Sequence, residues 1–174
     1  ILQSVVEGVA KAMGAKGCSL MLLSPDKKVL YHTAAYGLSD WYVRKGPVSA
    51  DRSISEALEG RPVAILEATV DPRIQYQEQA RKEGIASILS VPMTLREDII
   101  GVIRVYSGER RYFTLEDMYF VGAVANLGAI ALENARLYET VQKDYEAFRQ
   151  EMLEWRGALG HEWMVGETVA PPEE

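Results

Sequence analysis

The sequence predicts an α+β domain with a central antiparallel β-sheet, followed by one long helix. Three observations lead to this prediction. Two pairs of short apolar segments are each joined by a tight turn, as in antiparallel hairpins. Helical patterns flank them at both ends of the chain. The chain has 174 residues, 48% of them hydrophobic, which is enough for one domain with a buried core and an extension.

The first part of the chain predicts a helix and a hairpin. Residues 1–13 place apolar side chains at helical spacing, and two glycines follow them. Residues 18–24 and 28–36 are expected to be strands, because both are apolar and a Ser-Pro-Asp-Lys turn joins them. A long polar and aromatic loop is expected from 37 to 51.

Two short helices and a strand are expected between the two hairpins. A capping box formed by Ser53 and Glu56 predicts the first helix. Residues 63–66 predict a short strand. Asp71, which is followed by proline, predicts the N-cap of the second helix, and Gly84 predicts its end.

The second hairpin is expected to have two chemically different faces. Strands at 86–95 and 99–106, joined by a three-residue loop, give one wholly apolar face and one mixed face. A charged arginine in mid-strand is costly to bury without a partner, so the mixed face should meet water or a ligand cavity. A two-residue loop would shift the register and break this partition. The expected pairs are Leu95–Ile99, Met93–Gly101, Val91–Ile103, Leu89–Val105, Pro92–Val102, Ser90–Arg104 and Ile88–Tyr106.

A single long helix is expected after the second hairpin. Thr114 and Asp117 form a capping box at its start, and no strong Gly or Pro break follows for many turns. About 42 residues of helix would be ~63 Å long, which exceeds the diameter of a small domain. We therefore expect a folded domain at 1–137, a helical extension at 138–156 and a flexible tail at 157–174.

Four stretches of the sequence resemble the GAF domain family. The similarity covers about residues 1–140, and the order and spacing of the stretches make it specific. The stretches are Ala35-Tyr36-Gly37-Leu38, the IASILSVPM segment at 85–93, Ile100-Gly101-Val102-Ile103, and Phe113-Thr114 with Glu116-Asp117 running on to the ALENARLY segment at 131–138.

The resemblance implies both a fold and a role. GAF domains have a profilin- or PAS-like layered fold, in which helices from both chain ends cover one face of the sheet and a small-ligand pocket lies over the other. Most are sensory or regulatory modules that pass a signal to an attached output domain. By this likeness the chain is a non-enzymatic sensory module for an unknown small molecule, and the mixed face belongs to the pocket. A ligand-free dimerisation or scaffold module is the alternative.

Seven residues are candidates for ligand binding. Arginines and aromatic rings around a cavity suit a planar or anionic small molecule. Arg104 is expected to point into the cavity and to hold any anion. The alternative interpretation is a solvated loop and rim. The candidates are Trp41, Tyr42, Arg73, Tyr76, Ser90, Arg104 and Tyr106.

Two GAF subfamilies fit the sequence poorly. Members that bind cyclic nucleotides have an Asn-Lys…Phe…Asp-Glu motif. Phe113 and Asp117 match it, but Tyr106 stands in the Asn-Lys region and Met118 replaces the final Glu. Methionine sulfoxide reductases of the family need one thiol to attack and another to resolve the disulfide. Cys18 is the only cysteine, so this enzyme is the least favoured interpretation.

The histidines predict neither catalysis nor metal binding. His32 alternates within its strand and is expected to be a surface or edge residue. His161-Glu162 is similar to the start of a histidine-kinase phosphoacceptor box but lacks the Arg-x-Pro-Leu pattern that follows it. No nucleophile stands beside a base, so no hydrolase, kinase or reductase activity is expected. One cysteine and two distant histidines also make a metal site unexpected.

Charge and hydropathy indicate an aqueous, reducing compartment. The net charge of -6 argues against nucleic acid as a partner. No 18 apolar residues run together, so direct membrane insertion is not expected. A single cysteine fits a cytoplasmic protein.

The long helix contains a heptad seam that predicts a parallel homodimer. Its residues recur at alternating steps of four and three. The g residues Asp144 and Glu151 are acidic, and the e residues they would meet in a parallel partner, Arg149 and Arg156, are basic. A helix that folds back on its own domain is the alternative, and the first helix would join the dimer bundle. The seam consists of Leu127, Ala131, Asn134, Tyr138, Val141, Tyr145, Phe148, Met152 and Trp155.

Overall fold

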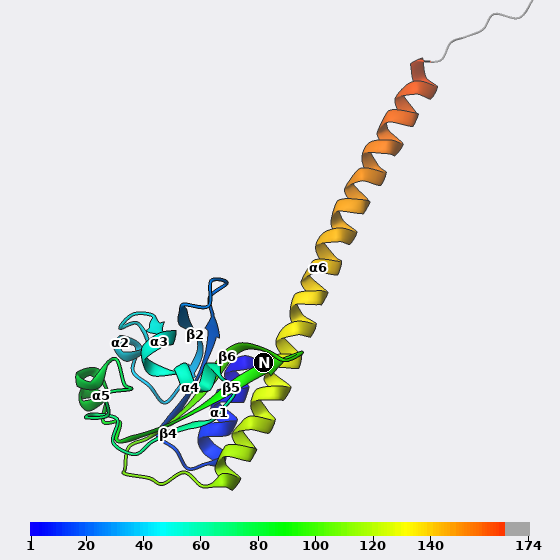
Figure 1. The fold of residues 1–174 in the computed structure, drawn as a ribbon. Helices are drawn as coiled ribbons and strands as arrows, with labels where there is room; N and C mark the ends of the chain where they lie inside the picture. The colour runs from blue at the N-terminus through cyan, green and yellow to red at the C-terminus, as the bar shows by residue number, and fades with distance from the viewer. Residues whose placement is uncertain (166–174) are drawn as a thin grey trace, which may run out of the picture. The chain divides into compact units, whose positions relative to one another are not determined.

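A six-stranded antiparallel sheet forms the centre of the structure, as the sequence predicts (Figure 1). The computed structural model describes residues 1–165, without the side chains of residues 52, 53 and 161–165. The strand order is β3-β2-β1-β6-β5-β4. The strands are β1 (Gly17–Leu23), β2 (Val29–Tyr36), β3 (Val48–Ser49), β4 (Val63–Ile65), β5 (Ser87–Leu95) and β6 (Asp98–Ser107).

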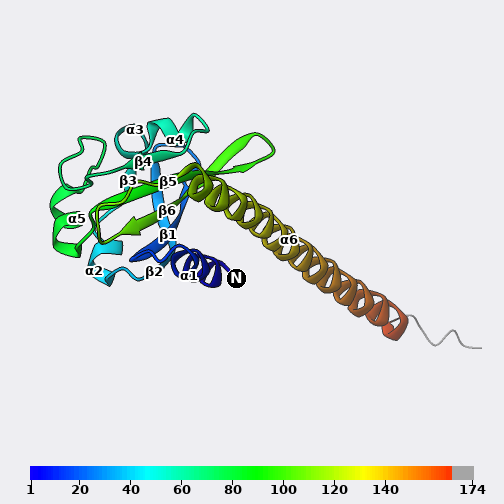
Figure 2. The same ribbon diagram turned by 90° about the horizontal axis from the view of Figure 1, so that it is seen from below.

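Helices cover both faces of this sheet (Figures 1 and 2). On one face lie α1 (Leu2–Ala12) and the first part of α6 (Leu115–Val165). On the other face lie four short helices, which are α2 (Asp40–Val43), α3 (Ala50–Ser53), α4 (Ser55–Leu58) and α5 (Gln77–Glu83). The predicted placement of the terminal helices on one face is therefore confirmed.

The β5–β6 hairpin has the two faces that the sequence predicts. All six expected pairs between residues 88–93 and 101–106 form. On the apolar face, α6 packs closely through glycines. A Cβ atom added at Gly122 would lie 3.9 Å from Val91 Cγ1, and one added at Gly128 would lie 3.5 Å from Met93 Cε. We call this side the helix face and the opposite side the mixed face.

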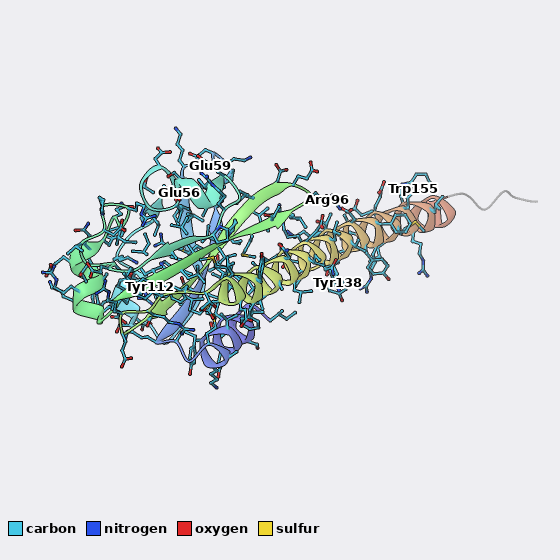
Figure 3. The ribbon with its side chains drawn as sticks, turned by 60° about the horizontal axis from the view of Figure 1, so that its bottom comes forward. Glu56, Glu59, Arg96, Tyr112, Tyr138 and Trp155 are labelled. Atoms are coloured by element: carbon cyan, nitrogen blue, oxygen red, sulfur yellow. The ribbon has the colours of Figure 1, made fainter. Side chains whose placement is uncertain are left out.

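The loop of this hairpin differs from the prediction. It contains two residues, Arg96 and Glu97, whose φ angles are 48° and 69° (Figure 3). Leu95 therefore pairs with Asp98, not with Ile99. A bulge immediately after Met93 takes up the extra residue of β6. In a bulge, two residues of one strand lie opposite one residue of the other. The residues beyond the bulge therefore pair in the predicted register, and their side chains stay on the predicted faces.

The region between the hairpins contains more structure than expected. The predicted loop at 37–51 includes α2, β3 and the start of α3. Ser53 ends α3 and does not cap the next helix, whose N-cap is Ile54. The predicted capping box at this point is therefore wrong.

The start of α5 is also later than predicted. Asp71 does not cap a helix, because its Oδ1 atom accepts a hydrogen bond from the backbone N–H of Arg73 at 2.9 Å and closes a turn. The helix begins only at Gln77. Its predicted end is confirmed, since Gly84 adopts a left-handed conformation with φ of 77° at the C-cap.

α6 begins as predicted and continues further than predicted. The backbone N–H of Thr114 donates to Asp117 Oδ2 at 2.9 Å, and that of Asp117 donates to Thr114 Oγ1 at 3.1 Å. The helix passes Gly157 and continues to Val165, so its predicted end at Gly157 is wrong and residues 157–165 of the expected tail are helical. An isolated glycine costs only about 1 kcal/mol in a helix. Residues 166–174 lie outside the described part of the chain.

The chain divides into two compact units after Ala131, somewhat before the predicted boundary at 137. The first unit, residues 1–131, contains the whole sheet and the first turns of α6. The second unit contains the rest of α6.

Candidate functional site

A group of polar and aromatic side chains gathers on the mixed face of the sheet, and we call it the mixed-face cluster. Its members come from β1, β2, β5 and β6 and from α2, α5 and the loop after α2. Strand register places Ser19, Arg104 and Ser90 next to one another on neighbouring strands. The cluster consists of Ser19, His32, Tyr42, Lys45, Glu83, Ser90, Arg104 and Tyr106.

Arg104 is a buried charge in the middle of this cluster. Its side chain is 4% exposed, and its Nε atom donates a hydrogen bond to Ser90 Oγ at 3.0 Å. Its charge also acts on the hydroxyl of Tyr106, which shares a hydrogen bond of 2.9 Å with Ser19 Oγ. Arg104 is therefore held by hydroxyl groups on the face opposite the terminal helices.

Two tyrosines form the aromatic centre of the cluster. Tyr42 from α2 and Tyr106 from β6 meet edge to face, with ring centroids 6.0 Å apart. Both are almost completely buried. Burial raises the pKa of each phenol, so both remain neutral at physiological pH.

Lys45 lies over the ring of Tyr42. Its Nζ atom is 3.7 Å from the centroid of that ring and donates a hydrogen bond to the backbone oxygen of Tyr42 at 3.0 Å. The ring of Tyr76 lies 5.2 Å from the same atom. Burial, aided by the charge of Arg104 and opposed by Glu83, lowers the pKa of Lys45 to about 8. This lysine is easier to deprotonate than a surface lysine.

His32 has buried ring nitrogens that lack a protein partner. Neither Nδ1 nor Nε2 makes a hydrogen bond within the described part of the chain. Burial, together with the charges of Lys45 and Arg104, lowers the pKa of His32 to about 4, so the ring is neutral at pH 7. The prediction of a surface residue is therefore wrong for the ring nitrogens. His32 does lie at the edge of the sheet, as predicted, because β3 pairs with β2 at Val29 and Leu30 and not beyond.

A second bulge decides which face of the sheet His32 occupies. In the β1–β2 pair, Leu20 lies opposite Ala34, but the next residue, Met21, lies opposite His32. Thr33 is the extra residue of the bulge. With strict alternation, His32 would share the helix face with Ala34. The bulge moves it to the mixed face, and no residue pattern in the sequence marks that change.

Glu83 supplies a carboxylate to the cluster. Its side chain is buried, and its Oε1 atom accepts a hydrogen bond from the backbone N–H of Ser39 at 2.7 Å. Its charge favours the protonated form of Lys45. Neither Glu83 nor Lys45 was singled out from the sequence, because both lie in segments without regular alternation.

The seven candidates from the sequence fall into two groups. Tyr42, Ser90, Arg104 and Tyr106 belong to the mixed-face cluster. Trp41 packs edge to face on Tyr42 but is 46% exposed. The other two candidates are Arg73 and Tyr76.

Arg73 and Tyr76 bind within the loops around the cluster. Arg73 forms ion pairs with Asp71 at 2.9 Å and with Glu56 at 3.4 Å. The hydroxyl of Tyr76 donates to the backbone oxygen of Pro47 at 2.9 Å, and its ring borders Lys45. The structure therefore places Arg73 in a local ion-pair network and Tyr76 at the edge of the cluster.

Cys18 lies in β1 and is completely buried. Burial raises the pKa of its thiol to about 12, so the reactive thiolate is scarce at neutral pH. Within residues whose side chains are described, no group of three or more His, Cys, Asp or Glu could hold a metal ion. The side chain of His161 lies outside those residues.

The GAF domain model matches residues 1–132, most of the chain and the whole sheet. The chain belongs to the GAF domain family. A relative from Methanosarcina acetivorans, a methyl sulfide methyltransferase-associated sensor, is 24% identical over 139 residues. Those residues are 76% of this chain and 14% of that sensor, so the chain corresponds to a small part of the relative.

Solved GAF structures share the fold. The GAF domain of a phosphoenolpyruvate-protein phosphotransferase from Coxiella burnetii is 20% identical, with a TM-score of 0.70 over 80% of this chain and 84% of that one. A domain assigned to a two-component sensor histidine kinase from Sinorhizobium meliloti is 17% identical, with a TM-score of 0.68 over 81% and 94%. GAF domains thus occur in sensor and signalling proteins.

The second unit presents the predicted seam. Each of its large side chains in this part of α6 is at least half exposed, from Met152 at 50% to Tyr138 and Tyr145 at 65% (Figure 3). Because the helix continues past Gly157, Leu159 extends the same heptad pattern by one position. The long helix therefore has an uncovered apolar stripe.

α6 also meets a simple test for membrane helices. Between Leu115 and Gly160, an 18-residue window reaches a mean hydropathy of 1.3 with few charges. Length and composition alone decide this test, and Val121, Ala125 and Ala129 of the same helix are buried in the first unit. One helix of this kind is weak evidence for a membrane span.

Proposed function

We propose that this chain is a non-enzymatic sensory module that receives a small molecule at the mixed-face cluster and signals as a parallel homodimer through α6. The exposed heptad seam is the observation that supports the dimer most directly. Seven large apolar or aromatic side chains, from Tyr138 to Leu159, follow one stripe and have high exposure. A single soluble helix rarely leaves such a stripe uncovered.

The charges beside the seam favour a parallel arrangement. In a parallel pair, Asp144 and Glu151 would face Arg149 and Arg156, which have the opposite sign. In such a dimer, a change at the mixed face could reach an output domain by rotation or sliding of the paired helices. An output domain and a cytoplasmic location belong to this proposal.

Light scattering of the full chain at micromolar concentration tests the dimer. Phe148→Glu places a charge in the seam and should convert the dimer into a monomer. Gln150→Glu adds the same charge two residues away on the opposite side of the helix and should leave the dimer intact. A monomeric wild-type chain, or a dimer that survives Phe148→Glu, would contradict the proposal.

The mixed-face cluster supports the sensory part of the proposal. It combines a buried arginine, a half-buried lysine and a histidine whose buried nitrogens lack a protein partner. Polar groups are rarely buried in this way without a partner. The buried Cys18 thiol offers no nucleophile, which supports a binding role over the reductase reaction.

A ligand-free scaffold is the second candidate, and one observation favours it. Tyr42 and Tyr106 pack against each other and are 2% and 1% exposed, so they already fill part of the mixed face. A thermal-shift screen separates the two functions. A ligand at 100 times its Kd should stabilise the chain by about 2.7 kcal/mol. No stabilising compound in a broad library would favour the scaffold.

A further inference from the structure

The mixed-face cluster contains more basic than acidic groups. The charges of Lys45 and Arg104 both oppose protonation of His32, and Arg104 opposes protonation of Lys45. Among the residues with described side chains, Glu83 is the carboxylate whose charge acts on Lys45. That carboxylate also accepts a backbone hydrogen bond from Ser39. A negative charge near the three basic groups would therefore be stabilised.

The three basic groups come from separate elements and belong to the same face of the sheet. Met21 of β1 lies opposite His32 on one side and opposite Val102 on the other. Arg104 follows Val102 by two positions, so it points to the same face as His32. The Nζ atom of Lys45 lies over the ring of Tyr42, which belongs to the same cluster.

His32 is the group that most clearly lacks a binding partner. Both of its nitrogens are buried, and a neutral imidazole has one donor and one acceptor to satisfy. A protonated imidazole has two donors, which suit the oxygens of an anion. An anion beside the ring would also offset the charges of Lys45 and Arg104 that now disfavour protonation.

We propose that the mixed-face cluster binds a compact oxyanion, a carboxylate or phosphate group, between His32, Lys45 and Arg104. Binding takes up one proton from solution, which goes to the imidazole of His32. Arg104 provides fixed positive charge, and the anion also favours the protonated form of Lys45. Tyr42, Tyr106 and Glu83 are the other titratable groups at this face, and the two phenols stay neutral. This inference rests on the proposed role of the mixed face as a ligand site.

Proton NMR of the full chain tests the inference through the ring resonances of His32. The resonances are assigned with His32→Gln, and His161 serves as the reference in the same spectrum. Sodium acetate and sodium phosphate are titrated at pH 6 and pH 8, with sodium chloride keeping the ionic strength constant. We expect a saturable shift of His32 toward its protonated position, with binding up to about a hundredfold tighter at pH 6 than at pH 8, because uptake of one proton changes the affinity up to tenfold per pH unit.

Variants identify the groups that hold the anion. Lys45→Met and Arg104→Met should each weaken binding at least about tenfold, since a charge-assisted hydrogen bond is lost. Arg81→Met is the matched control, because Arg81 lies on the surface of α5 and pairs with Glu78. It should leave binding unchanged. If Arg104→Met does not fold, Lys45→Met decides the result.

Two results would overturn the inference, and a neutral compound that stabilises the chain without any anion response is a case of the first. One is the absence of a saturable His32 shift with either anion. The other is wild-type affinity in Lys45→Met. Stabilisation by a neutral compound, with no response to either anion, would overturn it but would leave the proposed function standing. Failure of the dimer test affects only the proposed function.

Discussion

The two faces of the β5–β6 hairpin are made by alternate residues of the same strands, but they differ in what they bury. At its centre the helix face buries the apolar side chains of Leu89, Val91 and Ile103, which need no polar partner. At its end Ser87 is buried too, hydrogen-bonded to the backbone of Leu66 and Arg111. The mixed face buries the polar side chains of Ser90 and Arg104, and their burial is stabilised by hydrogen bonds and charge. The helix face thus holds the domain together, whereas the mixed face can respond to protons and solutes.

Neighbouring substitutions on the two faces should have the largest effect and test this comparison directly. Ile103→Ala removes a fully buried side chain from the helix face and should lower the free energy of unfolding by about 3 kcal/mol. Arg104→Met, one residue away on the mixed face, should lower it by less than half as much, because the desolvation cost of the buried charge disappears too. Urea unfolding measures both values, and a larger loss for Arg104→Met would break the comparison.

Acid should destabilise the domain through the mixed face. The pKa of His32 is about 4 in the folded protein, below its ordinary value of 6.5, so the unfolded chain binds the proton more readily. The contribution of neutral His32 to the free energy of unfolding is therefore complete above pH 6.5, and it is lost as the pH falls from 6.5 to 4. The expected loss is about 2 to 3 kcal/mol in the free energy of unfolding.

Unfolding curves at several pH values check this loss. His32→Gln should flatten the pH dependence within that window. An equal pH dependence in wild type and His32→Gln would show that His32 does not titrate with a low pKa.

The smallest effect is expected at the start of α6, the helix that covers the helix face. Thr114→Ala removes the hydroxyl that accepts a hydrogen bond from the backbone N–H of Asp117, and it should lower the free energy of unfolding by about 1 kcal/mol. Thr140→Ala is the control, since it makes the same chemical change on an exposed part of α6. Thermal unfolding compares the two, and equal melting temperatures would contradict a stabilising role for the capping box.

Several features could be read from the sequence because they depend on neighbouring residues. The alternation of 86–95 and 99–106 determined both strands and the two faces between them. Thr114 and Asp117 determined where α6 begins. Half of the mixed-face cluster, namely Tyr42, Ser90, Arg104 and Tyr106, was also among the candidates from the sequence. For the strands and the start of α6, local periodicity or a local hydrogen bond was sufficient evidence, whereas Tyr42 became a candidate through the family resemblance.

Other features were decided only by the tertiary structure. The hairpin loop proved shorter than predicted, and a bulge after Met93 restored the register. The bulge at Thr33 turned His32 from the helix face to the mixed face. The charges of Lys45 and Arg104 act on His32 because packing brings separate segments of the chain onto one face. A bulge depends on how two strands fit, and the pKa of a buried group depends on charges brought by other elements, so neither is determined by the order of nearby residues.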